Sequence, residues 1–180
     1  SLPTGKDDTF IVLHQMGNHG PSYYKRHPKE FGPFEPECQQ DDAFNCSNEA
    51  LVNAYDNDIY YTDHILAGVI RQLKKADKNR DVLMFYMSDH GESLGEKGAY
   101  LHGAPWMLAP DAQKHVPMIL WLSDATYQDM GVDAACLQQK LSLHHDHDNI
   151  FHTVMGLYTD RKSASYQRAL DVLANCRHQR

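Results

Sequence analysis

One short stretch of the sequence, SDHGESLG at residues 88–95, places two metal-binding side chains side by side, Asp89 and His90. A carboxylate oxygen and an imidazole nitrogen together suit Zn²⁺, whereas an all-oxygen set would suit Mg²⁺ or Ca²⁺. Gly91 and Gly95 let the backbone turn sharply where an apolar run ends, so that both side chains can face one ion. We therefore predict a metal site here. The competing interpretation is a helix-capping Asp89 beside a surface histidine.

Two further histidines, His19 and His102, are also followed directly by glycine. A single histidine in a turn is usually a surface residue. Three His-Gly pairs can instead converge on one crevice if they follow strands of the same parallel sheet, because ligands gather beyond the carboxyl ends of such strands. Twelve histidines in 180 residues also favour metal chemistry.

Three apolar runs predict the strands that would position these side chains, at residues 9–14, 81–88 and 116–122. Each run is short, nearly continuous and rich in β-branched or aromatic residues, which is typical of parallel strands covered on both faces. Between the first two runs, apolar residues recur at three- and four-residue steps and predict a helix over residues 48–76, capped by Ser47 or Asn48. The predicted core-facing stripe comprises Leu51, Tyr55, Ile59, Thr62, Leu66, Val69 and Leu73.

Two more helices are predicted towards the C-terminus. One begins near residues 146–148 and runs through Leu157, with Gly156 weakening its end, and the other covers residues 164–173. Strand–helix–strand order predicts a right-handed crossover and an α/β fold whose parallel sheet is flanked by helices. The sequence contains no internal repeat or linker, so residues 1–180 are expected to form one domain or part of one.

Composition narrows the classes of function. The formal net charge of −7 argues against nucleic-acid binding, because no basic stripe exists to neutralise phosphates. The sequence contains no run of about eighteen apolar residues, so no membrane-spanning helix is predicted. Four cysteines allow three pairings: Cys38 and Cys46 flank a short polar segment that suits a loop staple, while the sequence does not decide whether Cys136 and Cys176 pair. The first predicted strand lies a few residues from Ser1, which suggests a piece of a longer protein.

Several motifs resemble one enzyme family. They are HQMGNHGPSYYKR at residues 14–26, EALVNAYDN at 49–57 with YTD at 61–63, and above all SDHGESLGEKGAYLHG at 88–103. These runs are similar to the lipid A phosphoethanolamine transferases, which include the mobile colistin-resistance enzymes, within the alkaline phosphatase and sulfatase superfamily. The later runs HVPMILWLS, ACLQQK and HDNIF fit too, so the resemblance covers nearly the whole chain.

The resemblance implies roles for individual residues. Asp89 and His90 would be two ligands of the catalytic zinc, while His19 and His102 would bind the substrate phosphate or a second zinc. Glu92 would orient a ligand through a hydrogen bond. Cys38 and Cys46 would form a disulfide, in agreement with a periplasmic location. Two other histidine positions are assigned structural roles: His14 is expected to pack at a strand end, and the cluster at residues 144–148 is expected to cap a helix.

The family's nucleophile, a threonine, and an acidic zinc ligand lie in a part of the catalytic domain that precedes this chain. Thr4 and Thr9 stand in the wrong context to replace that threonine, so no catalytic nucleophile is predicted here and the fragment is expected to be inactive alone. The family's membrane-spanning N-terminal region is likewise expected upstream.

The intact enzyme would transfer phosphoethanolamine from phosphatidylethanolamine to a phosphate of lipid A through a covalent threonine intermediate. We expect it to act as a monomer at the periplasmic face of the bacterial inner membrane, with zinc as cofactor and no nucleic-acid partner. One alternative is a sulfatase or phosphoglycerol transferase of the same superfamily. The other is a non-catalytic envelope-binding domain that keeps the fold.

Overall fold

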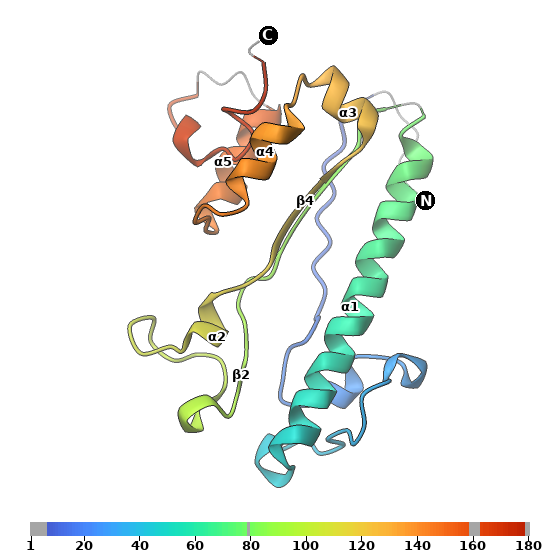
Figure 1. Cartoon of the computed structure of the whole chain (residues 1–180), viewed down its shortest axis with the longest axis vertical. Helices are drawn as coiled ribbons and strands as arrows, with labels where there is room; N and C mark the ends of the chain where they lie inside the picture. The colour runs from blue at the N-terminus through green and yellow to red at the C-terminus, as the bar shows by residue number, and fades with distance from the viewer. Residues whose placement is uncertain (1–6, 79, 159–162, 179–180) are drawn as a thin grey trace. The chain divides into compact units, whose positions relative to one another are not determined.

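The longest element is α1, a helix of 29 residues over Asn48–Ala76 (Figure 1). It confirms the helix predicted from the apolar periodicity. The Ser47 hydroxyl accepts a hydrogen bond from the Ala50 N–H at 3.2 Å and so caps the first turn. The helix supports much of the unit that contains the three histidines followed by glycine.

The computed structural model describes residues 7–78, 80–158 and 163–178, and these residues form two units. The first unit contains the described residues up to Gln72 together with Ser88–Pro117. The second contains Leu73–Met87 and the described chain from Met118 onwards. Within the described ranges, no helix is long and apolar enough to cross a bilayer.

The buried face of α1 is only partly the predicted apolar stripe. Leu51 is almost fully buried, but Ile59 is 47% exposed. Asn57 and Asp58 take the buried position in its place, at 0% and 1% exposure. The middle of the helix therefore holds the preceding loop through polar side chains. A prediction of the buried face that uses hydrophobicity alone does not find these residues.

His27 is the centre of this polar cluster. Its Nδ1 lies 2.7 Å from Asp58 Oδ1 and its Nε2 lies 3.0 Å from Glu37 Oε1. The Asn57 side chain donates to Glu37 Oε1 at 2.9 Å and accepts from the Phe34 N–H at 2.9 Å. The cluster thus ties a segment of irregular backbone to α1 through buried hydrogen bonds.

This cluster predicts a pH dependence of stability. Burial raises the pKa of Asp58 to about 7, with the His27 ring opposing the shift. Because the folded protein holds the Asp58 proton more tightly than the unfolded chain does, this carboxyl stabilises the fold fully below the unfolded pKa of about 4. The stabilisation is lost as the pH rises from about 4 through about 7. Asp58→Asn removes the titration, so its stability relative to wild type should rise across this window by up to ~1.4 kcal/mol per pH unit. Urea midpoints measured by circular dichroism at several pH values would check this. Asp56→Asn, on the exposed face of α1, is the control, and parallel curves for Asp58→Asn and wild type would contradict the prediction.

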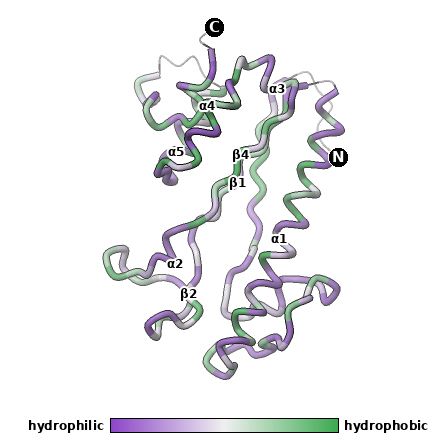
Figure 2. The backbone as a smooth tube through the Cα atoms, in the orientation of Figure 1, coloured by the Kyte–Doolittle hydropathy of each residue, from purple (hydrophilic) through white to green (hydrophobic). Residues whose placement is uncertain are grey.

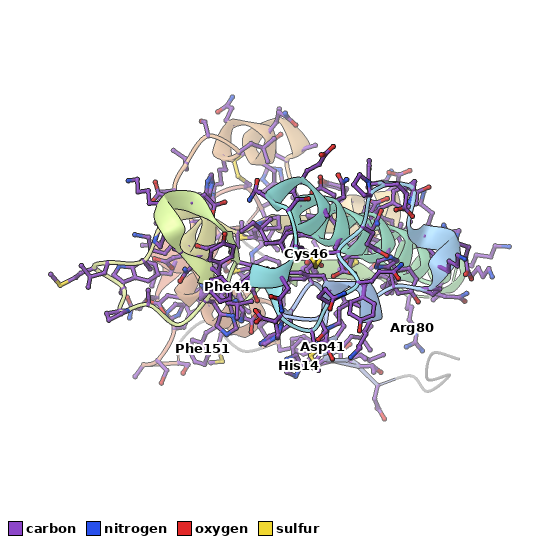
Figure 3. All side chains as sticks on the ribbon, turned by 90° about the horizontal axis from the view of Figure 1, so that it is seen from below. His14, Asp41, Phe44, Cys46, Arg80 and Phe151 are labelled. Carbon is purple, nitrogen blue, oxygen red and sulfur yellow. A yellow bond between two sulfur atoms is a disulfide. The ribbon has the colours of Figure 1, made fainter. Side chains whose placement is uncertain are left out.

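The apolar core of the first unit forms around the start of α1. Its buried members are Tyr23, Cys38, Ala43, Ala50, Leu51 and Ala54. Cys38 and Cys46 form a disulfide at its edge, which Figure 3 shows as a yellow bond beside the Cys46 label. The short hairpin of β2, Ser93–Leu94, and β3, Tyr100–Leu101, packs against this core through its leucines and Tyr100.

The second unit is built on two strands, β1 at Leu83–Met87 and β4 at Met118–Leu122. Both strands were predicted, but they pair antiparallel, with Leu83 opposite Leu122 and Met87 opposite Met118. The predicted parallel direction is therefore wrong for this pair. The intervening chain turns back through β2, β3 and α2, Asp111–Lys114, and no crossover helix lies between the two strands.

The predicted strand at residues 9–14 is not formed. Its apolar side chains stand exposed, from 48% at Ile11 to 73% at Val12. A strand of this composition is stabilised by burial between neighbouring strands and covering layers. In the part of the chain that the structure describes, neither of the two-stranded sheets includes this segment.

The helices of the second unit are α3, Asp124–Asp129, α4, Ala134–Lys140, and α5, Asp148–Tyr158. Only α5 was predicted. Its Gly156 is buried against Asp171, and a Cβ at this position would overlap the Asp171 carboxylate. The core of this unit comprises Leu122, Val132, Val172 and Leu173.

The helix predicted at residues 164–173 is wrong. The structure has only a 3-10 turn at Arg168–Leu170. The side chains of this segment serve a buried polar cluster instead: the Asp171 carboxylate accepts from Tyr166 Oη at 2.7 Å and from Arg177 at 2.5 Å. A regular helix would not leave the backbone free to place these groups together.

Cys136 and Cys176 form a second disulfide, which settles the pairing that the sequence left open. This bond closes a loop of 40 residues, whereas Cys38–Cys46 closes one of 8. Cross-links over longer loops remove more entropy from the unfolded chain, about 4 kcal/mol for the longer loop and about 2.5 kcal/mol for the shorter one. The Cys136→Ser/Cys176→Ser variant should therefore lose more stability than Cys38→Ser/Cys46→Ser. Urea unfolding of both variants would check the order, and the reverse order would show that native-state contacts dominate.

Candidate functional site

Three imidazole rings meet in the first unit: His19, His90 and His102. One nitrogen of each ring lies within 4.8 Å of those of the other two. The His90 and His102 rings stack with centroids 3.9 Å apart, and His19 lies edge-on to His102 at 4.8 Å. The structure therefore brings together the three histidines followed by glycine, from segments far apart in the sequence.

The Nδ1 atoms of all three rings face acceptors. His19 Nδ1 lies 2.7 Å from the Gly20 carbonyl oxygen, and His90 Nδ1 lies 3.0 Å from the Gly91 carbonyl oxygen. His102 Nδ1 lies 3.0 Å from Glu92 Oε1. A carbonyl oxygen can only accept, so Nδ1 carries the proton in His19 and His90, and the same assignment fits His102. Each Nε2 is then free to bind a metal ion or, when protonated, a phosphate oxygen.

Glu92 fixes this arrangement from a buried position, since its side chain is only 3% exposed. Its carboxylate accepts from the Gly20 N–H at 3.2 Å, from Tyr23 Oη at 3.4 Å and from His102 Nδ1 at 3.0 Å. Burial raises the pKa of Tyr23, and the nearby Glu92 carboxylate raises it further. The phenol therefore keeps the proton that it donates to Glu92. Glu92 thus connects the segments that carry His19 and His102.

The turn around Gly91 is held by close contact with α2. The Gly91 N–H donates to the Gln113 carbonyl oxygen at 3.1 Å. A Cβ on Gly91 would overlap the Ala112 carbonyl oxygen, so glycine is needed for this close approach. Gln113 also donates to the Ser93 hydroxyl at 2.8 Å, and both side chains are buried. These contacts fix the backbone on both sides of Glu92.

Asp89 lies beside the histidine group but outside it. Its side chain is 79% exposed, and Asp89 Oδ2 is 3.8 Å from His90 Nε2. The sequence analysis assigned Asp89 and His90 to one site and His19 and His102 to another. The structure does not separate these two pairs. The three rings form one group, and Asp89 is an adjacent carboxylate accessible to a ligand.

The other predicted positions take different roles. His14 is exposed, so its predicted packing at a strand end is wrong (Figure 3). At the start of α5, the Asp146 carboxylate accepts from the Asp148 N–H at 3.0 Å, and Asn149 Oδ1 accepts from the Asp146 N–H at 2.8 Å. Within the cluster at residues 144–148, Asp146 therefore takes the predicted capping role.

Two contributors to the site were not predicted. Tyr23 supports Glu92, and Arg26 Nε donates to the His19 carbonyl oxygen at 2.8 Å. Both lie within the run GPSYYKR that follows His19. Their proximity to His19 in the sequence was the available signal, but a tyrosine and an arginine in a polar run are more often exposed.

The donor set fits Zn²⁺ by chemistry. Neutral imidazoles whose Nδ1–H groups are held by oxygen acceptors are the usual form of zinc-binding histidines. The 4.8 Å spread is wider than the ~3.3 Å between ligand atoms of a tetrahedral zinc site. The rings would therefore move inward on binding, or two of them would contact a phosphate.

Comparison with known proteins places these residues in context. The sulfatase family profile matches residues 2–159. The chain is 49% identical over 173 residues to phosphoethanolamine transferase EptA of Salmonella typhimurium, covering 96% of this chain and 31% of that protein. It is 42% identical over 158 residues to phosphatidylethanolamine transferase Mcr-2 of Escherichia coli, covering 88% and 28%. The chain thus spans about a third of the length of these relatives.

A solved structure shares the fold. It is the integral membrane protein lipooligosaccharide phosphoethanolamine transferase A (EptA) from Neisseria meningitidis, with a TM-score of 0.89 at 43% identity. The match covers 93% of this chain and 31% of that one. The α/β, alkaline-phosphatase-like fold class is thereby confirmed for a partial domain with mixed helices and sheet.

Proposed function

The chain belongs to the sulfatase family, and from this premise we propose that it is the histidine-bearing part of a zinc-dependent enzyme that transfers phosphoethanolamine to lipid A. The observation that carries the proposal is the convergence of His19, His90 and His102 around the buried Glu92. The names of the relatives support the transferred group. Lipid A as the acceptor is supported by the name of another relative, Kdo(2)-lipid A phosphoethanolamine 7''-transferase of Escherichia coli, which is 35% identical over 158 residues.

The proposed reaction has two displacements at phosphorus. A threonine hydroxyl, supplied by a part of the longer protein outside this chain, attacks the phosphorus of phosphatidylethanolamine. The threonine O–P bond forms, the bond to diacylglycerol breaks, and the diacylglycerol oxygen takes a proton. A phosphate oxygen of lipid A then attacks the same phosphorus. Its O–P bond forms, the threonine O–P bond breaks, and the threonine oxygen takes up a proton, which leaves phosphoethanolamine on lipid A.

The residues of this chain would bind and orient the phosphoryl group. His19 and His102 would hold its oxygens with Nε2, while Asp89 and His90 would hold zinc. Bound zinc lowers the pKa of a coordinated hydroxyl and offsets phosphate charge. Glu92 keeps the His102 ring in one orientation, because its carboxylate is buried and its three donors come from two segments far apart in the sequence.

The location and partners follow from the same proposal. The donor and the acceptor are both membrane lipids, so the intact protein would work at the periplasmic face of the inner membrane, with membrane contact through its N-terminal region. We propose that it acts as a monomer, because the three histidines and Glu92 all come from a single copy of the chain.

A chimera tests the proposed function. This chain replaces the matched segment of Salmonella EptA, and the chimera is expressed in a bacterium that lacks its own transferase. Lipid A should gain the mass of phosphoethanolamine, and the cells should tolerate more polymyxin. Unmodified EptA is the positive control. A folded, membrane-inserted chimera that leaves lipid A unmodified would refute the proposal. Hydrolysis of a sulfate ester by such a chimera would instead favour a sulfatase.

Glu92→Gln in the chimera is expected to lower transfer by about 10- to 100-fold, the usual effect of losing a residue that orients a ligand. The amide keeps the size of the side chain, and its one oxygen can still accept from the Gly20 N–H and His102 Nδ1, but it removes the negative charge that holds the His102 Nδ1–H and raises the basicity of that ring. Glu92→Asp should restore part of the activity, whereas a purely structural role predicts that both variants lose stability in proportion to activity. Initial rates and urea midpoints measured together would separate the two outcomes.

A further inference from the structure

Three consecutive large apolar side chains are exposed a few residues after His102. Trp106 is 73% exposed, Met107 92% and Leu108 77%. They lie in residues 104–109, called here the Trp106 loop, between β3 and α2. Figure 1 shows this loop leading into α2, and Figure 2 shows hydrophobic colouring along it. An exposed run of this kind in a folded protein usually marks an interaction site.

The Trp106 loop is anchored at both sides of the exposed residues. The Pro105 carbonyl oxygen accepts from the Leu108 N–H at 2.8 Å and from the Ala109 N–H at 2.9 Å. Ala109 itself is buried, at 8% exposure. The loop therefore has a fixed backbone turn that presents the apolar side chains, although nothing in its own unit covers them.

The Trp106 loop and its flanks carry no acidic residue, although the protein as a whole is acidic. No carboxylate occurs between Glu96 and Asp111, whereas the whole chain carries a net charge of −7. Lys114 Nζ lies 5.4 Å from the centre of the Trp106 ring. The loop itself therefore carries no carboxylate that lipid headgroups would have to bury. The first carboxylate after it, Asp111, lies 3.7 Å from Lys114 Nζ, so that Lys114 offsets its charge beside the headgroup phosphates.

We propose that the Trp106 loop inserts Trp106, Met107 and Leu108 into a lipid surface at the boundary between headgroups and acyl chains. Tryptophan favours this boundary, because its ring is apolar and its N–H can still reach polar groups. The inference rests on the proposed function, since it presents lipid phosphates to the histidine site.

The dimensions agree with this position. Trp106 lies four positions after His102, which is at most ~14 Å of extended chain. The headgroup layer is about 5–8 Å thick on each side of a bilayer, and apolar side chains of interfacial segments enter about 5–10 Å. Insertion of the loop thus places His102 near the level of the phosphates.

Tryptophan fluorescence tests the proposal on the whole chain. The chain has two tryptophans, so Trp121→Phe leaves Trp106 as the only reporter. Vesicles of phosphatidylethanolamine and phosphatidylglycerol should shift its emission to the blue, and brominated acyl chains should quench it. Met107→Ser/Leu108→Ser should lower the vesicle partition coefficient at least tenfold, because two large apolar side chains are lost. The control is Leu141→Ser/Leu143→Ser, which removes side chains of 74% and 59% exposure in the other unit and should leave partitioning unchanged.

Three results would overturn the proposal. The first is no blue shift and no quenching with vesicles, and the second is an equal loss of partitioning in the control variant. The third is a blue-shifted, concentration-dependent spectrum before lipid is added, which would mean that a second copy of the chain covers the loop. A chimera active on lipid A together with a chain that does not bind vesicles would refute this inference alone. Vesicle binding with an inactive chimera would instead refute the proposed function.

Discussion

His90→Ala in the chimera is expected to lower transfer to lipid A by about three orders of magnitude and to remove at least one bound zinc per molecule. Within the histidine group, His90 is the ring that also lies beside the Asp89 carboxylate. It stacks on His102 at 3.9 Å within the histidine group, and its Nε2 lies 3.8 Å from Asp89. The loss of one preorganised group that stabilises transferred charge usually costs 10²–10³-fold, and the loss of a metal ligand adds to this effect.

The measurements are the initial rate of lipid A modification and the zinc content by atomic emission. His14→Ala is a matched control, because it removes an imidazole that is exposed and outside the group. It should leave both quantities within about twofold of the parent, as expected for a surface substitution. Normal turnover in a folded His90→Ala chimera would remove the basis for assigning His90 to the metal site.

Gly91→Ala should give the largest loss of stability among single substitutions at the site, about 2–3 kcal/mol. The new Cβ would overlap the Ala112 carbonyl oxygen, which is backbone and cannot turn aside as a side chain could. Relief of the overlap requires the turn that carries His90 and Glu92 to move away from α2, so the site should open as well.

Urea unfolding of the chain measures the first effect, and zinc affinity by calorimetry measures the second. Gly68→Ala is the control. Gly68 lies within α1, and a Cβ there would come no closer than 3.5 Å to the side chain of Arg71. Alanine is favoured over glycine by about 1 kcal/mol in a helix, so this variant should be slightly more stable than wild type. Equal stability of Gly91→Ala and wild type would show that the contact with α2 does not constrain the turn.

The sequence was sufficient to predict α1 and the meeting of three histidines, for different reasons. The helix has a periodic pattern long enough to exclude other structures. The histidines share a short local pattern, His followed by Gly, that recurs at three places. The family resemblance implied that Glu92 orients a ligand, but its burial could not be predicted from the residues, because a glutamate within a glycine-rich turn is usually solvated. Its burial depends on Tyr23 and Gly20, some seventy residues earlier in the chain.

Three wrong predictions of the fold each depend on contacts between segments that the local sequence does not show. The apolar residues 9–14 have strand composition, but a strand forms only where neighbouring strands pair with it, and composition does not show that. The direction of β1 and β4 depends on how the chain between them returns, which a continuous apolar run does not encode. Residues 164–173 have a helical pattern, yet the buried contacts of Asp171 with Tyr166 and Arg177 hold that segment in another shape.

Each disulfide closes within a single unit, Cys38 with Cys46 in the first and Cys136 with Cys176 in the second. This has a consequence for how the chain would mature during export through a membrane. Cys38 and Cys46, eight residues apart, would reach an oxidising compartment together and could pair before Cys136 had emerged. Among the four cysteines of this chain, the last two would then have only each other as partners. The order in which the chain is translocated would thus select the native pairing from the three that four cysteines allow, with little need for a disulfide isomerase.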